Sequence, residues 1–147
     1  MNAEPEISLF RPDRPGIRKV LGDLEAEIME LIWQRPGDQR TTVREVFEVL
    51  YEQRRVAYTT VMNTMVRLAK KRLLRVEKQD KAYVYVPTYT EQEFISQFVD
   101  RILKDLIFNF SSATMESLRA LPDSEEVRMM QRRLDELTRR RVEEEEA

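Results

Sequence analysis

The segment 54–72 constrains the fold of this chain more than any other stretch. Its most apolar residues recur at helical spacing and make one compact stripe on a helical wheel. That stripe consists of Val61, Thr64, Met65 and Leu68. The opposite face is made of Thr59, Asn63, Val66 and Lys70, flanked by Thr60, Met62 and Arg67. We therefore predict a helix that begins near Tyr58, buries one face and leaves a largely polar face able to contact base edges.

The charge around this helix points to a polyanion. The stretch from Arg54 to Lys81 holds nine basic and two acidic residues, whereas the whole chain has a net charge of −2. A local basic excess of this kind is typical of a surface that neutralises phosphates and releases their counterions. A solvated cationic face is the alternative for a charge run alone. The position of the run, beside the predicted helix and on the hairpin that follows it, favours DNA binding.

Two runs of β-forming residues follow the helix. They cover Leu74–Lys78 and Ala82–Val86, and the polar stretch Gln79–Lys81 between them predicts a β-hairpin. The hairpin would bring Lys78 and Lys81 to phosphates beside the helix. A two-stranded edge with solvated charges is the alternative interpretation.

Two more helices are predicted upstream. The first covers Asp23–Gln34 with Gly22 as its N-cap, and we interpret its Trp33 as a core residue rather than a functional aromatic. The second opens with the capping box Thr42–Glu45. Because a helix N-terminus favours anions, Thr42 is also a candidate phosphate contact. Three helices followed by a basic hairpin are the order of a winged helix-turn-helix domain.

Beyond Pro87 the pattern changes to long helices. A second capping box, Thr90–Glu93, precedes an apolar stripe that is too wide for a lone surface helix. A short helix around Ala113–Arg119 and a last helix from Ser124 to about Arg141 are predicted after it. The stretch is too short to close a core alone, so we expect two copies to interleave their helices. The candidate dimerisation residues are Phe94, Phe98, Ile102, Leu106, Phe110, Met130, Leu134 and Leu137.

These patterns divide the chain into four parts. We predict a flexible N-terminal arm at 1–19, a winged-helix DNA-binding domain at 20–87, a helical dimerisation region at 88–142 and an acidic tail at 143–147. The fold class is mainly α with a small β-hairpin. The basic residues of the arm could reach along DNA, and an unstructured tail is the alternative.

Composition excludes several classes of function. The chain has no cysteine and no histidine, which removes disulfides, thiolate or imidazole metal sites and the common nucleophile and base pairs. Its three glycines are scattered, so no phosphate-binding glycine loop can form. We therefore expect no enzyme, no cofactor and no metal. With no apolar run near membrane-spanning length, we expect a cytoplasmic protein without a membrane partner.

Several segments together resemble the BlaI/MecI (penicillinase repressor) family. The segments that carry the resemblance are Leu21–Trp33, Thr42–Val46, Ala57–Met62, Arg67–Lys71 and Tyr83–Tyr85. The resemblance implies a homodimeric repressor with an N-terminal winged helix and a C-terminal helical dimerisation region, bound to palindromic operators of double-stranded DNA. Members that respond to β-lactams are inactivated by proteolysis, so an inactivating protease or a sensor protein is a further candidate partner.

The resemblance also places the family's DNA-facing segment on Ala57, Tyr58, Thr59, Thr60, Met62, Asn63 and Arg67. Together with the basic approach loop, the helix cap and the hairpin tip, the candidate DNA-binding residues are Thr42, Arg54, Arg55, Ala57, Tyr58, Thr59, Thr60, Met62, Asn63, Arg67, Lys78 and Lys81. The chain departs from the family at Arg72, where members usually have glycine. We therefore expect the helix cap there to be made differently, or the helix to run on.

Two other functions stay open on the sequence. The same fold could be a protein-interaction module whose basic face meets an acidic partner. It could also be a ligand-sensing regulator of the PadR or MarR type, which would need an apolar small-molecule pocket.

Overall fold

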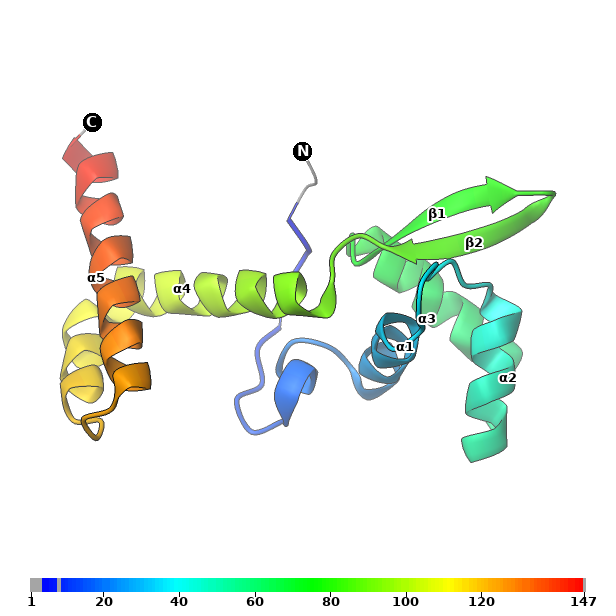
Figure 1. The fold of residues 1–147 in the computed structure, drawn as a ribbon, viewed down its shortest axis with the longest axis horizontal. Coiled ribbons are helices and arrows are strands. Elements are labelled where there is room, and N and C mark those ends of the chain that lie inside the picture. The colour runs from blue at the N-terminus through cyan, green and yellow to red at the C-terminus, as the bar shows by residue number, and fades with distance from the viewer. Residues whose placement is uncertain (1–3, 8, 147) are drawn as a thin grey trace. The chain divides into compact units, whose positions relative to one another are not determined.

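The structure is a computed structural model that describes residues 4–7 and 9–146 (Figure 1). Residues 1–3 and 8 of the predicted arm and residue 147 of the predicted acidic tail lie outside the described residues. The chain divides into two compact units, residues 1–98 and residues 99–147. Its secondary structure is mainly α-helical with one antiparallel hairpin, which confirms the predicted fold class.

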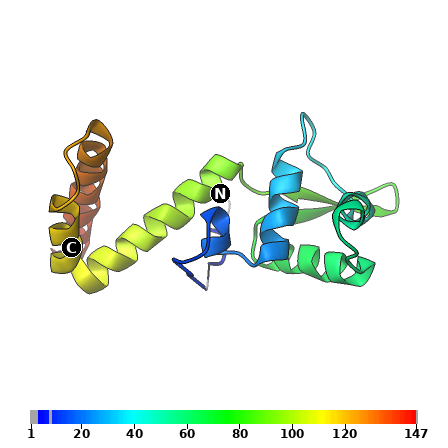
Figure 2. The same cartoon turned by 90° about the horizontal axis from the view of Figure 1, so that it is seen from below.

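The first unit is a winged helix-turn-helix domain. Its elements in chain order are η1 (Gly16–Lys19), α1 (Asp23–Trp33), α2 (Val43–Gln53), α3 (Tyr58–Lys70), β1 (Leu74–Gln79) and β2 (Ala82–Pro87). Figure 2 shows α1 in blue crossing α3 in green. The core residues that these elements bury together include Ile28, Met29, Ile32, Val46, Leu50, Val61, Met65, Leu68, Leu74 and Val84. The core thus fixes α3 from one side only.

Local capping explains where α1 and α2 begin. The Gly22 N–H donates to Glu25 Oε1 at 3.0 Å at the start of α1. At the start of α2 the Thr42 hydroxyl accepts the Glu45 N–H at 3.1 Å, and the Thr42 N–H donates to the Glu45 carboxylate at 3.3 Å. Free amides at a helix start are satisfied in this way by nearby side chains. The predicted capping box at Thr42 is confirmed.

The hairpin turns tightly and is tied to the loop between α1 and α2. β1 and β2 pair antiparallel, and Asp80 and Lys81 make the turn with φ angles of 48° and 68°. Two successive positive φ values match the right-handed twist of the flanking strands. Thr41 and Tyr85 exchange two backbone hydrogen bonds of 3.0 Å and 2.8 Å. The predicted hairpin is confirmed, and this bridge anchors its base.

The C-terminal cap of α3 corrects the expectation for Arg72. Arg72 itself adopts the left-handed conformation, with φ of 66°. Its N–H donates to Ala69 O at 3.0 Å and the Leu73 N–H donates to Leu68 O at 3.0 Å. These are the two hydrogen bonds of a Schellman motif. The cap is therefore the one that glycine makes, although a left-handed residue with a Cβ costs about 1–2 kcal/mol.

This geometry predicts that glycine is more stabilising than alanine at position 72, the reverse of their usual order within a helix. Arg72→Gly should be more stable than Arg72→Ala by about 1 kcal/mol, because both lose the guanidinium and only alanine keeps a Cβ in the left-handed region. Urea unfolding followed by Trp33 fluorescence measures the difference. At Lys70, whose backbone is helical, the glycine variant should instead be the less stable of the two. Equal stabilities at position 72 would contradict the assignment of strain.

The described part of the N-terminal segment lies against the first unit. The Glu6 N–H donates to Lys71 O at 2.9 Å, and Arg72 Nε donates to Glu4 O at 2.7 Å. Ile17 is buried, and Arg14 forms an ion pair with the carboxylate of Asp23. This arrangement differs from the flexible arm that we predict for 1–19. The physical reason is long-range burial, which a segment without periodicity does not reveal.

The start of α4 (Glu91–Arg119) belongs to the first unit. Phe94 is fully buried, with its ring centroid 5.7 Å from that of Trp33 and 5.5 Å from that of Phe98. Trp33 also donates its indole N–H to Tyr89 O at 2.9 Å, which agrees with the core role predicted for it. The division of the chain falls after Phe98 rather than after Pro87, because these aromatic rings pack on α1.

The second unit holds the rest of α4 and α5 (Glu125–Glu146). Phe110 has non-helical angles, so α4 consists of two helices that meet at a kink, and the second of them contains the short helix predicted around Ala113–Arg119. Ile107, Leu134 and Leu137 form a small buried cluster, with Leu103, Met115 and Leu118 partly buried against it. Among the candidate dimerisation residues, Leu106, Phe110 and Met130 are exposed, Ile102 is half-buried, and Phe94, Phe98, Leu134 and Leu137 are buried within the chain.

Candidate nucleic-acid interface

α3 presents one buried and one exposed face. Val61, Thr64, Met65 and Leu68 are buried, as the helical wheel predicts, and the Thr64 hydroxyl donates to Thr60 O at 2.7 Å. The other face is exposed along its whole length, at Thr59, Thr60, Met62, Asn63, Val66, Arg67 and Lys70. The exposed face therefore offers an amide and two hydroxyls next to cations, which is the mixture that can contact base edges and phosphates.

The loop before α3 carries a second group of exposed side chains. Arg54, Arg55 and Ala57 lie between α2 and α3, and Ala57 is the N-cap of α3. The Arg55 guanidinium contacts Tyr51 of α2, and Tyr58 packs edge-on against Phe47 at a centroid distance of 5.4 Å. These aromatic contacts hold the entry of α3 against the end of α2.

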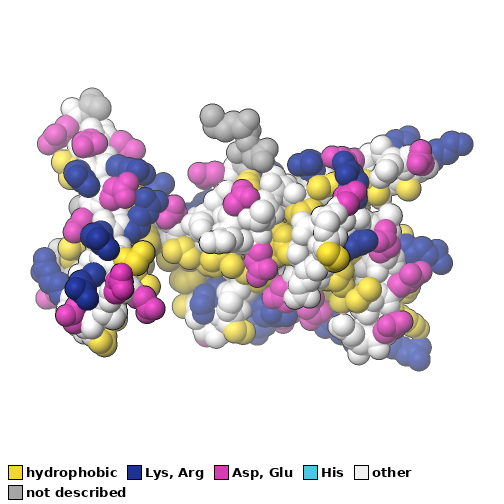
Figure 3. All heavy atoms as spheres, in the orientation of Figure 1, with side chains coloured by type: hydrophobic (Ala, Val, Ile, Leu, Met, Phe, Trp, Pro, Cys, Tyr) yellow, Lys and Arg dark blue, Asp and Glu magenta, His cyan; other side chains and the backbone are white. Residues whose placement is uncertain are grey.

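The hairpin brings cations to its tip. Lys78 and Lys81 are exposed near the turn, and Figure 3 shows Lys and Arg side chains gathered at the end of the hairpin. Closer to the base, Arg75 and Arg40 each contact Glu77 at 3.2 Å. Both arginines hold the pKa of the Glu77 carboxyl below its ordinary value. The basic residues at the base are thus partly neutralised, whereas those at the tip are not.

The basic residues of this surface fall into two classes. Arg54 pairs with Glu27 at 2.8 Å, and Lys71 pairs with the buried carboxylate of Glu25 at 2.8 Å. The Thr42 hydroxyl is likewise occupied by its capping box. The second class forms no ion pair with any other described residue. Its members are Arg55, Arg67, Lys70, Lys78 and Lys81. The second class has its full charge available to an external anion.

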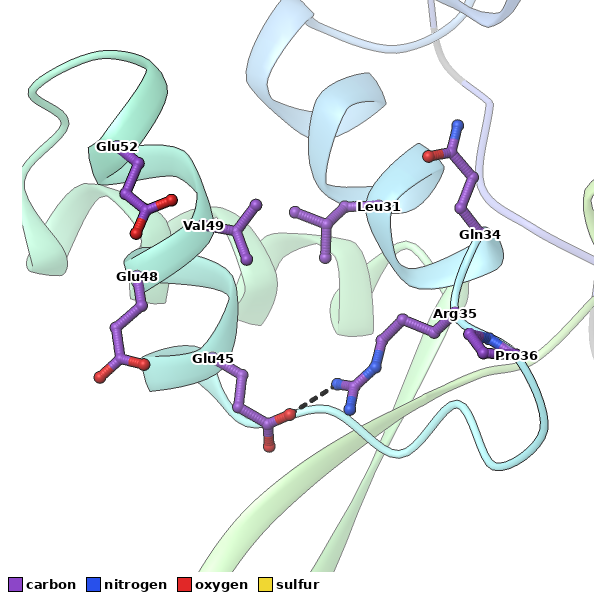
Figure 4. A pocket seen from close by; sticks show the side chains of 8 residues that line it. All are labelled: Leu31, Gln34, Arg35, Pro36, Glu45, Glu48, Val49 and Glu52. Carbon is purple, nitrogen blue, oxygen red and sulfur yellow. Dashed lines mark ion pairs between the residues drawn. The ribbon is translucent and has the colours of Figure 1, made fainter.

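A groove of about 590 Å³ between α1 and α2 has the opposite character. Figure 4 shows Leu31 and Val49 pointing toward one another across it, with three glutamates of α2, Glu45, Glu48 and Glu52, along its edge. Arg35 pairs with Glu45 at 2.7 Å. Burial alone would raise the pKa of Glu45, but hydrogen bonds from Arg35 and Thr42 outweigh it and lower the pKa. Glu48 in turn pairs with Arg44 at 3.2 Å. The acidic edge of this groove sets it apart from the basic surface of α3 and the hairpin.

The sequence predicted which side chains of α3 are exposed, but it did not predict the contact that holds Arg55. Tyr51 of α2 is 42% exposed, and its hydroxyl accepts a hydrogen bond from Arg55. The signal that could have identified it is the spacing of four residues between this tyrosine and the arginine, on the side of α2 that faces the start of α3.

Comparison with known proteins assigns the family. A family model described as penicillinase repressor matches residues 21–139. The chain belongs to the penicillinase repressor family. The match includes both units and omits the N-terminal segment. This is a family of repressors and not of enzymes, in agreement with the composition. Within the described residues, no group of acidic side chains is arranged to hold a metal ion. Nor is any described helix long and apolar enough to cross a membrane.

Individual relatives agree with this family. The protein named transcriptional regulator BlaI in two strains of Mycobacterium tuberculosis, CDC 1551 / Oshkosh and ATCC 25618 / H37Rv, is 43% identical over 76 residues, which cover 52% of this chain and 54% of the relative. The match thus spans about half the length of these curated relatives. The penicillinase repressor of Bacillus licheniformis is 26% identical over 98 residues, covering 61% of this chain and 74% of that protein.

One solved structure is also similar. It is the solution structure of the monomeric form of Bacillus licheniformis BlaI in complex with the blaP half-operator. It shares 27% sequence identity with this chain, gives a TM-score of 0.42, and the similarity covers 50% of this chain and 85% of that one.

Proposed function

We propose that this protein is a transcriptional repressor that binds double-stranded operator DNA in a sequence-specific manner. The observation that carries the proposal is the exposed face of α3, where Thr59, Thr60 and Asn63 lie among cations without ion-pair partners in the described residues. Membership of the penicillinase repressor family and relatives named BlaI support the same function. Operator binding would block transcription, and such a protein acts in the cytoplasm.

In this proposal some side chains of α3 contact bases, whereas others on α3 and the hairpin contact phosphates. The Asn63 amide can donate and accept at once, the pattern that pairs with adenine in the major groove, and the Thr60 hydroxyl can pair with several bases. Arg67 and the hairpin residues Lys78 and Lys81 can contact phosphates, which fix the register of the protein without reading sequence. Specificity would therefore come from the middle of α3 and affinity from its flanks.

We also propose that the repressor is a homodimer on palindromic sites. The second unit has a small core and leaves Leu106, Phe110 and Met130 exposed. Leu106 and Phe110 line a hollow of about 380 Å³ with Leu118 and Leu121. Exposed apolar area of this kind on a short helical unit is most simply covered by a second copy. An inactivating protease or a sensor protein is a further partner that we propose from the family resemblance alone.

The function is tested by binding to the DNA upstream of the protein's own gene. Affinity is compared with that for scrambled DNA of equal length at about 150 mM salt, and the mass of the complex gives the stoichiometry. Two chains per site and a preference of about a thousandfold or more would support the dimeric repressor. A further selection of binding fragments from genomic DNA covers the case of an operator that lies elsewhere. Equal affinity for the upstream, scrambled and selected DNA would instead support a protein-interaction module with a basic face.

Asn63→Ala is predicted to reduce discrimination between operator and scrambled DNA. The expected loss is about 1–3 kcal/mol of specificity, because one bidentate base contact is removed from an exposed position that does not support the core. The same titration measures it. Lys78→Ala is the matched control and should weaken binding to both DNAs about equally, since phosphates carry no sequence information. Unchanged discrimination in Asn63→Ala would remove this residue from the base contacts.

A further inference from the structure

Arg55 is held in place by an exposed aromatic residue rather than by an acid. It lies in the loop between α2 and α3, and its Nη1 donates to the Tyr51 hydroxyl at 2.8 Å. Its guanidinium carbon is also 5.3 Å from the centroid of the Tyr51 ring. Hydrogen bonding and cation–π attraction therefore act on the same guanidinium. Both interactions favour one position of this exposed side chain.

Tyr51 is in turn supported by other aromatic rings. The Phe47 ring lies 5.3 Å from the Tyr51 ring and 5.4 Å from the Tyr58 ring. Phe47 is half-buried, whereas Tyr51 and Tyr58 are exposed by 42% and 43%. The series Tyr58, Phe47, Tyr51 and Arg55 thus connects the first residue of α3 to the approach loop through the end of α2.

The neighbouring arginine shows what this arrangement achieves. Arg54 is paired with Glu27 at 2.8 Å, so its charge is balanced within the chain. Arg55 is held by a neutral phenol, which orders the guanidinium without neutralising it. A guanidinium has five N–H donors, and the bond to Tyr51 uses one of them. The other donors keep the planar geometry that pairs with two oxygens of a phosphate.

We propose that Tyr51 is a positioning residue that orders Arg55 for a backbone phosphate beside the recognition helix. The ligand is a phosphodiester of DNA, and the inference rests on the proposed DNA-binding function. Because ordering a long side chain opposes binding, a guanidinium that is already fixed binds its phosphate more tightly. Tyr51 contributes to affinity through Arg55 and has no contact of its own with DNA.

A double-mutant cycle in the full chain tests this inference. Arg55→Ala should weaken binding and reduce the slope of log affinity against log salt by about one, as expected for one lost phosphate contact. Tyr51→Leu should weaken binding about three- to tenfold at 150 mM salt with the slope unchanged, because the phosphate contact still forms. In the Arg55→Ala background Tyr51→Leu should have no further effect. Tyr51→Phe, which keeps the ring and loses the hydroxyl, should fall between wild type and Tyr51→Leu.

Side-chain dynamics of the free protein provide a readout without DNA. The ¹⁵N relaxation of Arg55 Nε should report a rigid group in wild type and a mobile one in Tyr51→Leu, while the urea midpoint from Trp33 fluorescence stays the same. If Arg55 becomes mobile but DNA affinity is unchanged, the phosphate role is overturned. If Tyr51→Leu weakens binding equally with and without Arg55, the positioning role is overturned. Wild-type protein that binds no DNA but keeps Arg55 rigid would refute the proposed function and the phosphate role with it.

Discussion

Phe94→Ala is expected to lower the free energy of unfolding of the first unit by about 3–5 kcal/mol, the usual cost of removing a buried phenylalanine. The Phe94 side chain has no exposed surface and packs against Trp33 and Phe98. Alanine would leave a cavity between α1 and the start of α4, which the surrounding rings can fill only in part. Urea unfolding measures the loss, and the single tryptophan of the chain reports from the cavity wall.

The next residue provides the control for this prediction. Ile95 is on the same turn of α4 and is 36% exposed, so Ile95→Ala should cost less than about 1 kcal/mol. The comparison also separates two roles for Phe94. A core residue of the first unit lowers its unfolding midpoint at every protein concentration. If Phe94→Ala changed only the association of two chains and left that midpoint in place, the packing seen within the chain would not describe its role.

The elements that sequence predicted best are those specified by nearby residues. The buried stripe of α3 follows from helical periodicity, and the starts of α2 and α4 follow from Thr42 and Thr90, each with a glutamate three residues later. The hairpin follows from alternation and from a polar turn at Asp80. Each signal acts over a few residues, so it survives without knowledge of the rest of the fold.

The features that sequence did not predict depend on contacts between distant residues. Phe94 belongs to an apolar stripe that suits an interchain surface equally well, and only its contact with Trp33 places it in the first unit. Arg72 was expected to prevent the cap that glycine makes, yet the chain accepts a left-handed arginine whose side chain binds Glu4 O. The periodicity of apolar residues predicts neither the packing of Phe94 nor the cap at Arg72, because it shows which side of a helix is apolar and not what covers that side.

The same distinction between nearby and distant contacts applies to the candidate interface. A helical wheel identified the exposed face of α3, since exposure there is the complement of the buried stripe. It could not identify which cations are balanced within the chain. Arg54 and Arg55 are adjacent and identical in type, but one reaches Glu27 of α1 and the other Tyr51 of α2. Their difference arises entirely from the packing of the helices.

Lys71→Met is expected to lower the free energy of unfolding by about 2–4 kcal/mol, because it leaves a buried carboxylate without its cation. The Glu25 residue is only 5% exposed, and its carboxylate oxygens lie 2.8 Å and 3.1 Å from Lys71 Nζ. The same carboxylate accepts the Gly22 N–H at the start of α1. The ion pair therefore joins the first turn of α1 to the end of α3. Urea unfolding of the variant measures its contribution.

Lys70→Met is the matched control, since it removes the same charge one residue earlier, on the exposed face of α3. It should change stability by no more than about 0.5 kcal/mol, as is usual for surface positions. Adding Glu25→Gln to Lys71→Met should recover part of the loss, because the amide still accepts the Gly22 N–H and carries no charge. If the two lysine variants were equally stable, the ion pair between Glu25 and Lys71 would contribute nothing to the free energy of unfolding. DNA binding should show the reverse order, with the larger loss of affinity at Lys70, because Lys70 is exposed whereas Lys71 is paired with the buried carboxylate of Glu25.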